Sequence, residues 1–331
     1  MRSERALLVA AGGGIGDTLL AGVVGRALRA RFAAVDAVVL PAHAALAARM
    51  PMFDRRLALG DRLPARYDTA IVTWATLQTA LLPFAARIPV RVGQARRLYS
   101  ALFTQRVVVR SERGDRTTPW TQILLDYARA IGCDLDDPAP EFVPNDDDRS
   151  DADALLRVHG VGDAFYVLHP TRALSAQHAR WPTEGLVRLA RELARRDGIP
   201  IFVTGAAGDA SIAEAIADGS GRDVIAVAGA TSIGAFGALA SRARAVMAVD
   251  SGPMHVAAAV GAPTVGIFAL QSDEPDRWGP QGRRVAVVRP AYPCPPWHKK
   301  ETCPDFACVR ELDSARIIAA LDGLLGAAAE S

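Results

Sequence analysis

The chain has 331 residues, of which 50% are hydrophobic and 22% are charged, and its formal net charge is +2. This length suits two domains of roughly 150 residues each, and the composition is that of a globular protein rather than a disordered one. The near balance of charge disfavours a nucleic-acid partner. No apolar run reaches the ~18 residues of a membrane-spanning helix, and we expect a cytoplasmic protein.

Short apolar runs alternate with amphipathic stretches of helical length in the first part of the chain. Glycines follow the first of these runs, and a stretch with the pattern of an amphipathic helix comes directly after them. Strands are expected at residues 6–10, 35–41, 68–74, 87–93 and 106–110. This alternation predicts parallel βαβ units with helices on both faces of a sheet.

The alternation stops at residues 133–153, where prolines and acidic residues are concentrated, and this stretch is predicted to be a linker. Beyond it the alternation resumes, with strands expected at 165–170, 199–205, 223–229, 243–250 and 262–268. We therefore predict an α/β fold of two tandem Rossmann-like domains, residues 1–150 and 151–331, with a cleft between them. Ligands of such sheets bind beyond the carboxyl ends of the strands.

The loop after the first strand reads VAAGGGIGDTLL. Gly12 and Gly14 fit the start of the dinucleotide-binding fingerprint, but Asp17 stands where its third glycine belongs, which disfavours a dehydrogenase. A carboxylate held at the start of a helix can take a proton from a sugar hydroxyl. The alternative is helix capping, because aspartate stabilises helix N-termini. The spacing leaves both roles open for Asp17.

The loop after the strand at 165–170 is rich in polar and cationic residues. Arg172, His178 and Arg180 could neutralise a diphosphate leaving group. A solvated loop that is anchored by Trp181 is the alternative interpretation.

The stretch VDSGPMHVAAAV follows the strand at 243–250 and opens the next helix. Gly252 and the helix start offer free backbone N–H groups, which bind phosphate, and Ser251 adds a hydroxyl. His255 lies within the first helical turn and would face the same ligand. The alternative is a capped joint between strand and helix with a buried histidine.

Together these loops resemble those of glycosyltransferase family 9, the ADP-heptose:lipopolysaccharide heptosyltransferases. The resemblance rests on GIGD after the first strand, RWP before a mid-chain helix, DSGPMHVAAAVGAPTVGIF and RWGP, and the tail YPCPPWHKKETCPDFACVREL is similar to that of second-heptose transferases. It spans nearly the whole chain. It implies an inverting, metal-independent GT-B enzyme without a cofactor, which moves a heptose from ADP-heptose to an anionic glycolipid, the lipopolysaccharide inner core.

The resemblance also implies roles for individual residues. Asp17 matches the general base, with Gly16 beside it on the acceptor side. The donor site would comprise Thr171, Arg180, Thr231, Ser232, Asp250, Ser251, Gly252 and His255. Family members usually carry a lysine just before RWP. This chain has Ala179 there, so Arg180 or His178 would take over the role of the lysine.

Arginines are concentrated in one part of the first domain: Arg87, Arg91, Arg96, Arg97, Arg106, Arg110, Arg113 and Arg116. Only Glu112 and Asp115 oppose them there. One interpretation is an acceptor-side surface for an anionic glycolipid at the inner membrane, with Arg91, Arg96 and Arg97 as candidate contacts. The other interpretation is a set of solvated helix faces.

The tail carries four residues with metal-ligand chemistry, Cys294, His298, Cys303 and Cys308. Their spacing fits no standard zinc pattern, and partly buried thiols that pack on the core are the favoured interpretation. We therefore expect no metal.

Other functions remain compatible with the sequence. A family member could use another nucleotide sugar or a protein acceptor, and the sequence does not decide between them. A GT-B epimerase would rearrange its sugar without any acceptor, so acceptor dependence separates it from a transferase. A non-catalytic binder of sugar nucleotides, which the missing lysine motivates, would bind the donor without any role for Asp17.

Overall fold

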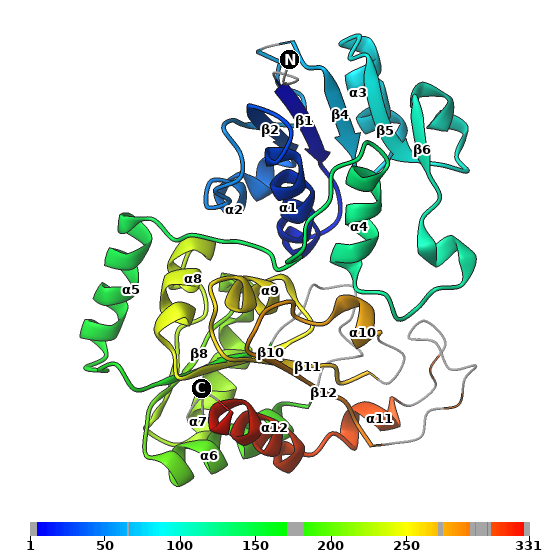
Figure 1. Cartoon of the computed structure of the whole chain (residues 1–331). Coiled ribbons are helices and arrows are strands. Elements are labelled where there is room, and N and C mark those ends of the chain that lie inside the picture. Colours follow the sequence, from blue (N-terminus) through cyan, green and yellow to red (C-terminus); the bar gives the residue numbers. More distant parts are fainter. Residues whose placement is uncertain are drawn as a thin grey trace. The chain divides into compact units, whose positions relative to one another are not determined.

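The computed structural model describes residues 5–64, 66–170, 182–270, 274–291, 295, 303 and 306–327. The chain divides into two compact units, Met1–Val143 and Pro144–Ser331. In the described residues each unit is built on a six-stranded parallel sheet with helices packed on it (Figure 1). The predicted α/β fold of two Rossmann-like sheets is confirmed.

The first unit has the strand order β3-β2-β1-β4-β5-β6, which is the order of the Rossmann fold. Its strands are β1 (Arg5–Ala10), β2 (Ala34–Val39), β3 (Arg56–Ala58), β4 (Thr69–Val72), β5 (Val90–Gln94) and β6 (Gln105–Val107). Its α-helices are α1 (Ile15–Arg29), α2 (Ala44–Ala47), α3 (Leu77–Ala85) and α4 (Trp120–Arg129), and short 3-10 helices include η1 (Pro41–His43), η2 (Leu98–Leu102) and η3 (Arg110–Arg113).

The second unit repeats this topology, with the strand order β12-β11-β10-β7-β8-β9. Its strands are β7 (Tyr166–His169), β8 (Ile201–Val203), β9 (Val224–Ala226), β10 (Ala245–Val249), β11 (Thr264–Ile267) and β12 (Val285–Val288). Its helices are α5 (Asp146–Val158), α6 (Thr183–Asp197), α7 (Ala210–Ser220), α8 (Ile233–Arg242), α9 (Gly252–Ala259), α10 (Pro275–Trp278), α11 (Ala307–Arg310) and α12 (Ser314–Gly326). In this repeat, β7 takes the place of β1 and β10 takes the place of β4.

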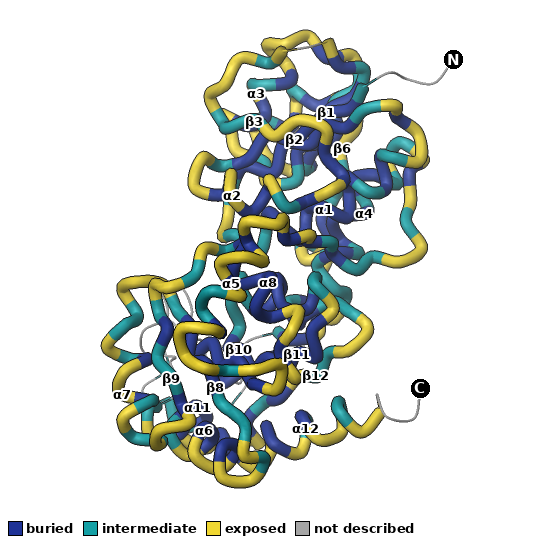
Figure 2. The backbone as a smooth tube through the Cα atoms, turned by 90° about the vertical axis from the view of Figure 1, so that its left-hand side faces the viewer, coloured by how far each residue is buried: buried dark blue, intermediate teal, exposed yellow. Residues whose placement is uncertain are grey.

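The central strands are continuous apolar runs because helices cover both faces of each sheet. In β1 every residue after Arg5 is buried, and Figure 2 shows β1 and β2 buried within the first unit. Helix α1 packs on β1 and β2, and α3 packs on β4 and β5. The helices therefore cover the faces of the sheets and leave the ends of the strands available to ligands.

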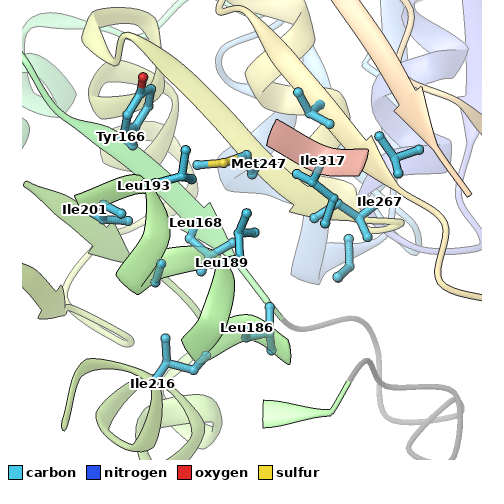
Figure 3. Packing of buried hydrophobic residues seen from close by; sticks show 14 of the residues in the cluster. Tyr166, Leu168, Leu186, Leu189, Leu193, Ile201, Ile216, Met247, Ile267 and Ile317 are labelled. Carbon is cyan, nitrogen blue, oxygen red and sulfur yellow. The ribbon is translucent and has the colours of Figure 1, made fainter. Parts of the chain in front are cut away.

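In the core of the second unit, one face of helix α6 packs into a cluster of buried hydrophobic residues (Figure 3). Leu186, Leu189 and Leu193 of α6 recur at helical spacing on one face and are buried. They join a cluster that includes Met247 of β10 and Ile317 of α12. Helix α6 ends at Gly198, whose φ of 66° suits glycine.

The expected linker at 133–153 is corrected by the structure, because α5 begins inside it. Asn145 caps this helix by accepting a hydrogen bond from the Asp148 N–H at 2.9 Å. The acidic residues Asp146, Asp147 and Asp148 occupy its first turn, where they complement the helix dipole. The acids that suggested a solvated linker therefore belong to a helix start.

The edge strands β3 and β12 were not expected from the sequence.

In the ranges that the structure describes, no helix is both long enough and apolar enough to cross a bilayer.

Candidate functional site

Each sheet has a topological switch point, between β1 and β4 in the first unit and between β7 and β10 in the second. At such a point the chain leaves two neighbouring strands in opposite directions, and the carboxyl edge there is the usual ligand site. Asp17 follows β1, and the stretch from Asp250 to His255 follows β10. Asp17 and the stretch from Asp250 to His255 thus lie at the switch points.

Asp17 lies in the first turn of α1, beside Gly16. Its Oδ2 accepts a hydrogen bond from the Gly14 N–H at 2.8 Å, so the carboxylate caps the helix. Gly13 has a φ of 67°, and a Cβ atom at this position would lie 2.3 Å from Oδ2 of Asp17. The glycine loop therefore lets the carboxylate fold back onto the backbone.

Burial raises the pKa of Asp17, while the hydrogen bond from Gly14 and the charge of His43 act in the opposite direction. A carboxyl group whose pKa is raised holds a proton more readily than an exposed one. The capping contact uses Oδ2 and leaves the group in a position where it borders a pocket. Capping and proton transfer are therefore compatible roles for this side chain.

His43 lies behind Asp17, although no sequence motif pointed to it. Nδ1 of His43 and Oγ1 of the neighbouring Thr18 share a hydrogen bond of 2.7 Å, and both residues are buried. Burial lowers the pKa of His43, and the charge of Asp17 partly opposes this effect. The pKa of His43 therefore lies below the ordinary 6.5.

Asp17 borders a small pocket that opens to solvent and lies within the first unit. The other residues that line it are Ala10, Gly12, Thr73, Trp74, Trp120 and Leu124. Trp74 is 40% exposed. A Cβ atom at Gly12 would lie 2.0 Å from Cδ1 of Trp74. Gly12 thus allows the indole ring to lie directly against the loop that carries Asp17.

Sequence reasoning missed both tryptophans of this pocket. Trp74 follows the end of β4 by two residues, and β4 pairs with β1, so its position at the same sheet edge was the available signal. Trp120 begins α4, which packs against α1. No local pattern marks Trp120, because its place depends on helix packing.

In the second unit, β10 ends at Val249 and α9 begins at Gly252. Ser251 is the N-cap residue, but its hydroxyl donates to the Val249 carbonyl at 2.8 Å and does not cap the helix. A helix start without a side-chain cap offers its N–H groups to an anion. Asp250 is partly buried beside it, with its own N–H bonded to the Ile267 carbonyl at 3.1 Å.

His255 is only 5% exposed. Burial lowers its pKa to about 4, so the imidazole is neutral at pH 7. Among the described residues, Nδ1 of His255 has no hydrogen-bond partner. A neutral imidazole can donate or accept a hydrogen bond but cannot supply a positive charge to a phosphate.

The remaining donor-site candidates fall into two groups. Ser232 caps α8 by accepting a hydrogen bond from the Ala235 N–H at 3.1 Å, and Thr231 directly precedes it. Thr171 and Arg180, together with His178, lie outside the described residues.

The three arginines expected on the acceptor side differ in their contacts. Arg91 donates to the Leu102 and Ile88 carbonyls at 2.7 and 2.5 Å, so its guanidinium braces the backbone. Arg97 forms an ion pair of 2.9 Å with Glu112. Arg96 is exposed.

Two of the four tail residues with ligand chemistry, Cys294 and His298, lie outside the described residues. Cys308 is buried, and Sγ of Cys303 accepts a hydrogen bond from the Phe306 N–H at 3.3 Å. Within the part of the chain that the structure describes, no group of three or more His, Cys, Asp or Glu residues is arranged to hold a metal ion.

Comparison with known sequences identifies the family of the chain. The sequence profile of glycosyltransferase family 9 (heptosyltransferase) matches residues 56–305. The chain is 26% identical over 312 residues to lipopolysaccharide heptosyltransferase 2 of Escherichia coli (strain K12), and the match covers 83% of this chain and 85% of that protein.

Solved structures agree in fold. A glycosyltransferase of family 9 from Veillonella parvula DSM 2008 matches with a TM-score of 0.85 at 17% identity, over 100% of this chain and 99% of that chain. The ADP-heptose lipopolysaccharide heptosyltransferase II of E. coli matches with a TM-score of 0.79 at 20% identity, over 99% of this chain and 100% of that chain. The predicted GT-B fold class is confirmed. Because the family profile covers well over half of the sequence, the chain belongs to glycosyltransferase family 9, the heptosyltransferases.

Proposed function

We propose that this glycosyltransferase moves a heptose from ADP-heptose to a lipopolysaccharide inner-core acceptor, with inversion and without a metal ion. The observation that carries the proposal is the pocket in which Asp17 lies beside Trp74 and Trp120. The E. coli structure that matches nearly the whole chain is an ADP-heptose lipopolysaccharide heptosyltransferase, which supports this choice of donor and acceptor.

The acceptor sugar binds in the pocket of the first unit, with an apolar face of its ring against Trp74. Indole rings offer a large, rigid apolar surface, while a neighbouring carboxylate accepts hydrogen bonds from hydroxyl groups. The acceptor hydroxyl donates its proton to Asp17 as its oxygen attacks the donor sugar. Burial, which raises the pKa of Asp17, supports this role because it makes the carboxylate a better proton acceptor.

The donor diphosphate binds at the start of α9, where the Ser251 side chain leaves the backbone N–H groups uncapped. Asp250 holds hydroxyls of the sugar, and Thr231 and Ser232 line the nucleoside. Thr171 contributes a hydroxyl to the phosphates. This arrangement uses backbone dipoles for the anion and keeps the carboxylate of Asp250 for neutral hydroxyls.

The transfer makes one bond and breaks one. The acceptor oxygen bonds to the anomeric carbon from the face opposite the diphosphate, the bond from that carbon to the phosphate oxygen breaks, and ADP leaves with the bonding electrons. Arg180 stabilises the growing negative charge in place of the usual lysine. His255 contributes a hydrogen bond rather than a charge, because burial lowers its pKa to about 4.

Calorimetry with ADP, UDP, GDP and CDP tests the donor, first with EDTA and then with Mg²⁺. We expect selective ADP binding that EDTA leaves unchanged. A transfer assay with ADP-heptose and heptose-deficient lipopolysaccharide then measures acceptor-dependent ADP release, and NMR of the product gives the anomeric configuration.

Other outcomes point to the other functions. Preference for another base would discard ADP-heptose but keep the fold and the inverting chemistry. Sugar rearrangement without an acceptor would indicate an epimerase, and transfer to a protein alone would replace the lipid acceptor. Donor binding without any turnover would leave a non-catalytic binder.

A further inference from the structure

One segment of the first unit exposes an unusual amount of apolar side chain. Eight large hydrophobic residues are exposed in the described part of the chain, and five of them lie between residues 74 and 98. They are Trp74 (40% exposed), Leu77 (59%), Leu81 (41%), Phe84 (48%) and Leu98 (101%). Scattered exposed apolar residues need no explanation, but a concentration of this kind marks an interaction surface.

Helix α3 accounts for this surface, because it is apolar on both of its faces. Leu77, Leu81 and Phe84 follow a spacing of four and three residues, which places them on one side of the helix. Ala80 and Pro83 are buried on the side that faces the sheet. The helix contains no charged residue. A helix that is hydrophobic all round is normally covered on every side.

The neighbouring 3-10 helix extends the same surface. Helix η2 packs against α3, and it begins with Leu98. We call Leu77, Leu81, Phe84 and Leu98 the α3 face. Trp74, which borders the pocket of Asp17, lies just before the Thr76 cap of the same helix.

The charge around the α3 face is mostly positive, although Arg97 pairs with Glu112 and Arg110 pairs with Asp126. Residues 69–111 contain six arginines and no aspartate or glutamate. Arg87 and Arg96 are exposed next to the apolar positions, and the guanidinium carbon of Arg91 lies 5.5 Å from the centre of the Phe84 ring. An apolar stripe with an arginine rim is the pattern of a segment that lies in the interface of an anionic bilayer.

We propose that the α3 face docks on the surface of an anionic lipid bilayer, with its apolar side chains among the acyl chains and its arginines at the headgroups. A second copy of this chain fits less well, because pairing two such faces would bring their arginines together. If the proposed function holds, the bilayer also presents a lipid-anchored acceptor next to Trp74 and Asp17. The docking itself does not depend on which sugar is moved.

Flotation of the full chain with lipid vesicles tests the proposal, without donor or acceptor. The vesicles contain either phosphatidylcholine alone or phosphatidylcholine with about a third phosphatidylglycerol. We expect the wild-type chain to float with the anionic vesicles and to stay in solution with the neutral ones. Replacing a leucine that inserts into the bilayer by a polar residue should weaken partitioning about tenfold, and we expect this for Leu77→Ser.

Matched variants separate the α3 face from general surface effects. Val158→Ser alters an exposed apolar residue of α5, 79% exposed, and should leave flotation unchanged. Arg87→Ala should lower partitioning about fivefold, the effect of one cationic residue at an anionic surface. Arg222→Ala removes a similarly exposed arginine of the second unit and should have no effect.

Three results would overturn the proposal. The wild-type chain could fail to bind anionic vesicles, or Leu77→Ser could bind as tightly as the wild type. Light scattering could also reveal a dimer that Leu77→Ser dissociates, in which case a second copy covers the face. Transfer to a delipidated, water-soluble acceptor is measured in parallel. It reports on the proposed transferase activity alone, so failure of either proposal is seen separately.

Discussion

The two units share one strand order but differ in the residues that lie at the switch point. In the first unit a glycine loop folds the carboxylate of Asp17 back onto the helix start, next to two tryptophans. In the second unit the start of α9 lacks a side-chain cap, and the nearby His255 is buried. One topology thus presents a carboxylate beside aromatic rings in one unit and backbone N–H groups at a helix start in the other. Function here depends on a few side chains rather than on the fold.

A second comparison shows that the same local capping contact occurs at two different places in the fold. The Ala206 N–H donates to Oδ2 of Asp209 at 2.9 Å, as the Gly14 N–H donates to Oδ2 of Asp17 at 2.8 Å. Asp209 follows β8, which is not at the switch point, whereas Asp17 follows β1, which is. The two carboxylates have the same capping contact but different positions in their sheets.

The largest expected effect comes from Asp17→Asn. The amide can still accept the hydrogen bond from Gly14 but cannot take a proton, so we expect kcat to fall by about 10²- to 10⁴-fold. ADP affinity, measured by calorimetry, should stay unchanged. The matched variant Asp209→Asn should keep kcat at saturating donor. Near-normal turnover of Asp17→Asn would remove the base assignment.

Acid should weaken the second unit more than the first. Burial lowers the pKa of both His169 and His255 from the ordinary 6.5 to about 4. Between these values the unfolded chain binds more protons than the folded one, so stability falls as pH falls from 6.5 to 4. Each histidine accounts for roughly 3 kcal/mol by pH 4. In the first unit, the charge of Asp17 opposes the corresponding effect on the pKa of His43.

Hydrogen exchange at pH 7 and pH 5 measures this difference strand by strand. We expect β7 and β10 to lose more protection at pH 5 than β1 and β4. His169→Gln, whose partner Thr204 lies 3.0 Å from Nδ1 in the wild type, should reduce the dependence on pH. Equal loss of protection in both sheets would contradict the prediction.

A smaller effect is expected for Trp74→Ala. The loss of a stacking surface should raise the KM for the acceptor about tenfold, with kcat and donor affinity little changed. Trp74→Phe should restore most of the affinity, because it keeps an aromatic face. Initial rates at varied acceptor concentration check both variants, and an unchanged KM would place the acceptor elsewhere.

The smallest effect concerns the stability of Asp17→Asn. Burial raises the pKa of Asp17 above that of the unfolded chain, so the folded state holds the proton more tightly and stability declines as pH rises through the folded pKa. The neutral amide avoids this loss, and we expect a gain on the order of 0.5 kcal/mol at pH 7. Denaturant unfolding at pH 7 measures it, and a clear loss of stability there would show that the cap needs the negative charge.

The parts of the fold that could be predicted are those that depend on local sequence. The apolar run of β1, the glycine loop and the helix start at Asp17 lie next to one another in the chain, so their pattern is visible there. The start of α5 was missed because acidic residues are typical of both linkers and helix N-termini. The spacing from Asn145 to Asp148, a capping box, was the signal that distinguishes the two.

The pocket could not be predicted, because it joins residues that are distant in the sequence. Trp74 reaches Asp17 through the pairing of β4 with β1, and Trp120 reaches it through the packing of α4 on α1. His43 comes from yet another segment, after β2. The edge strands β3 and β12 are short, and their pairing with the preceding strands β2 and β11 supplies what local propensity does not.

The ionisable residues of the segment that carries the α3 face determine how its charge depends on pH. Residues 69–111 contain no Asp, Glu, His, Lys or Cys beside their six arginines, and arginine stays protonated throughout the physiological range. The positive charge of these six arginines is therefore constant throughout that range. Their attraction to a surface would respond to ionic strength and to the density of anionic lipid.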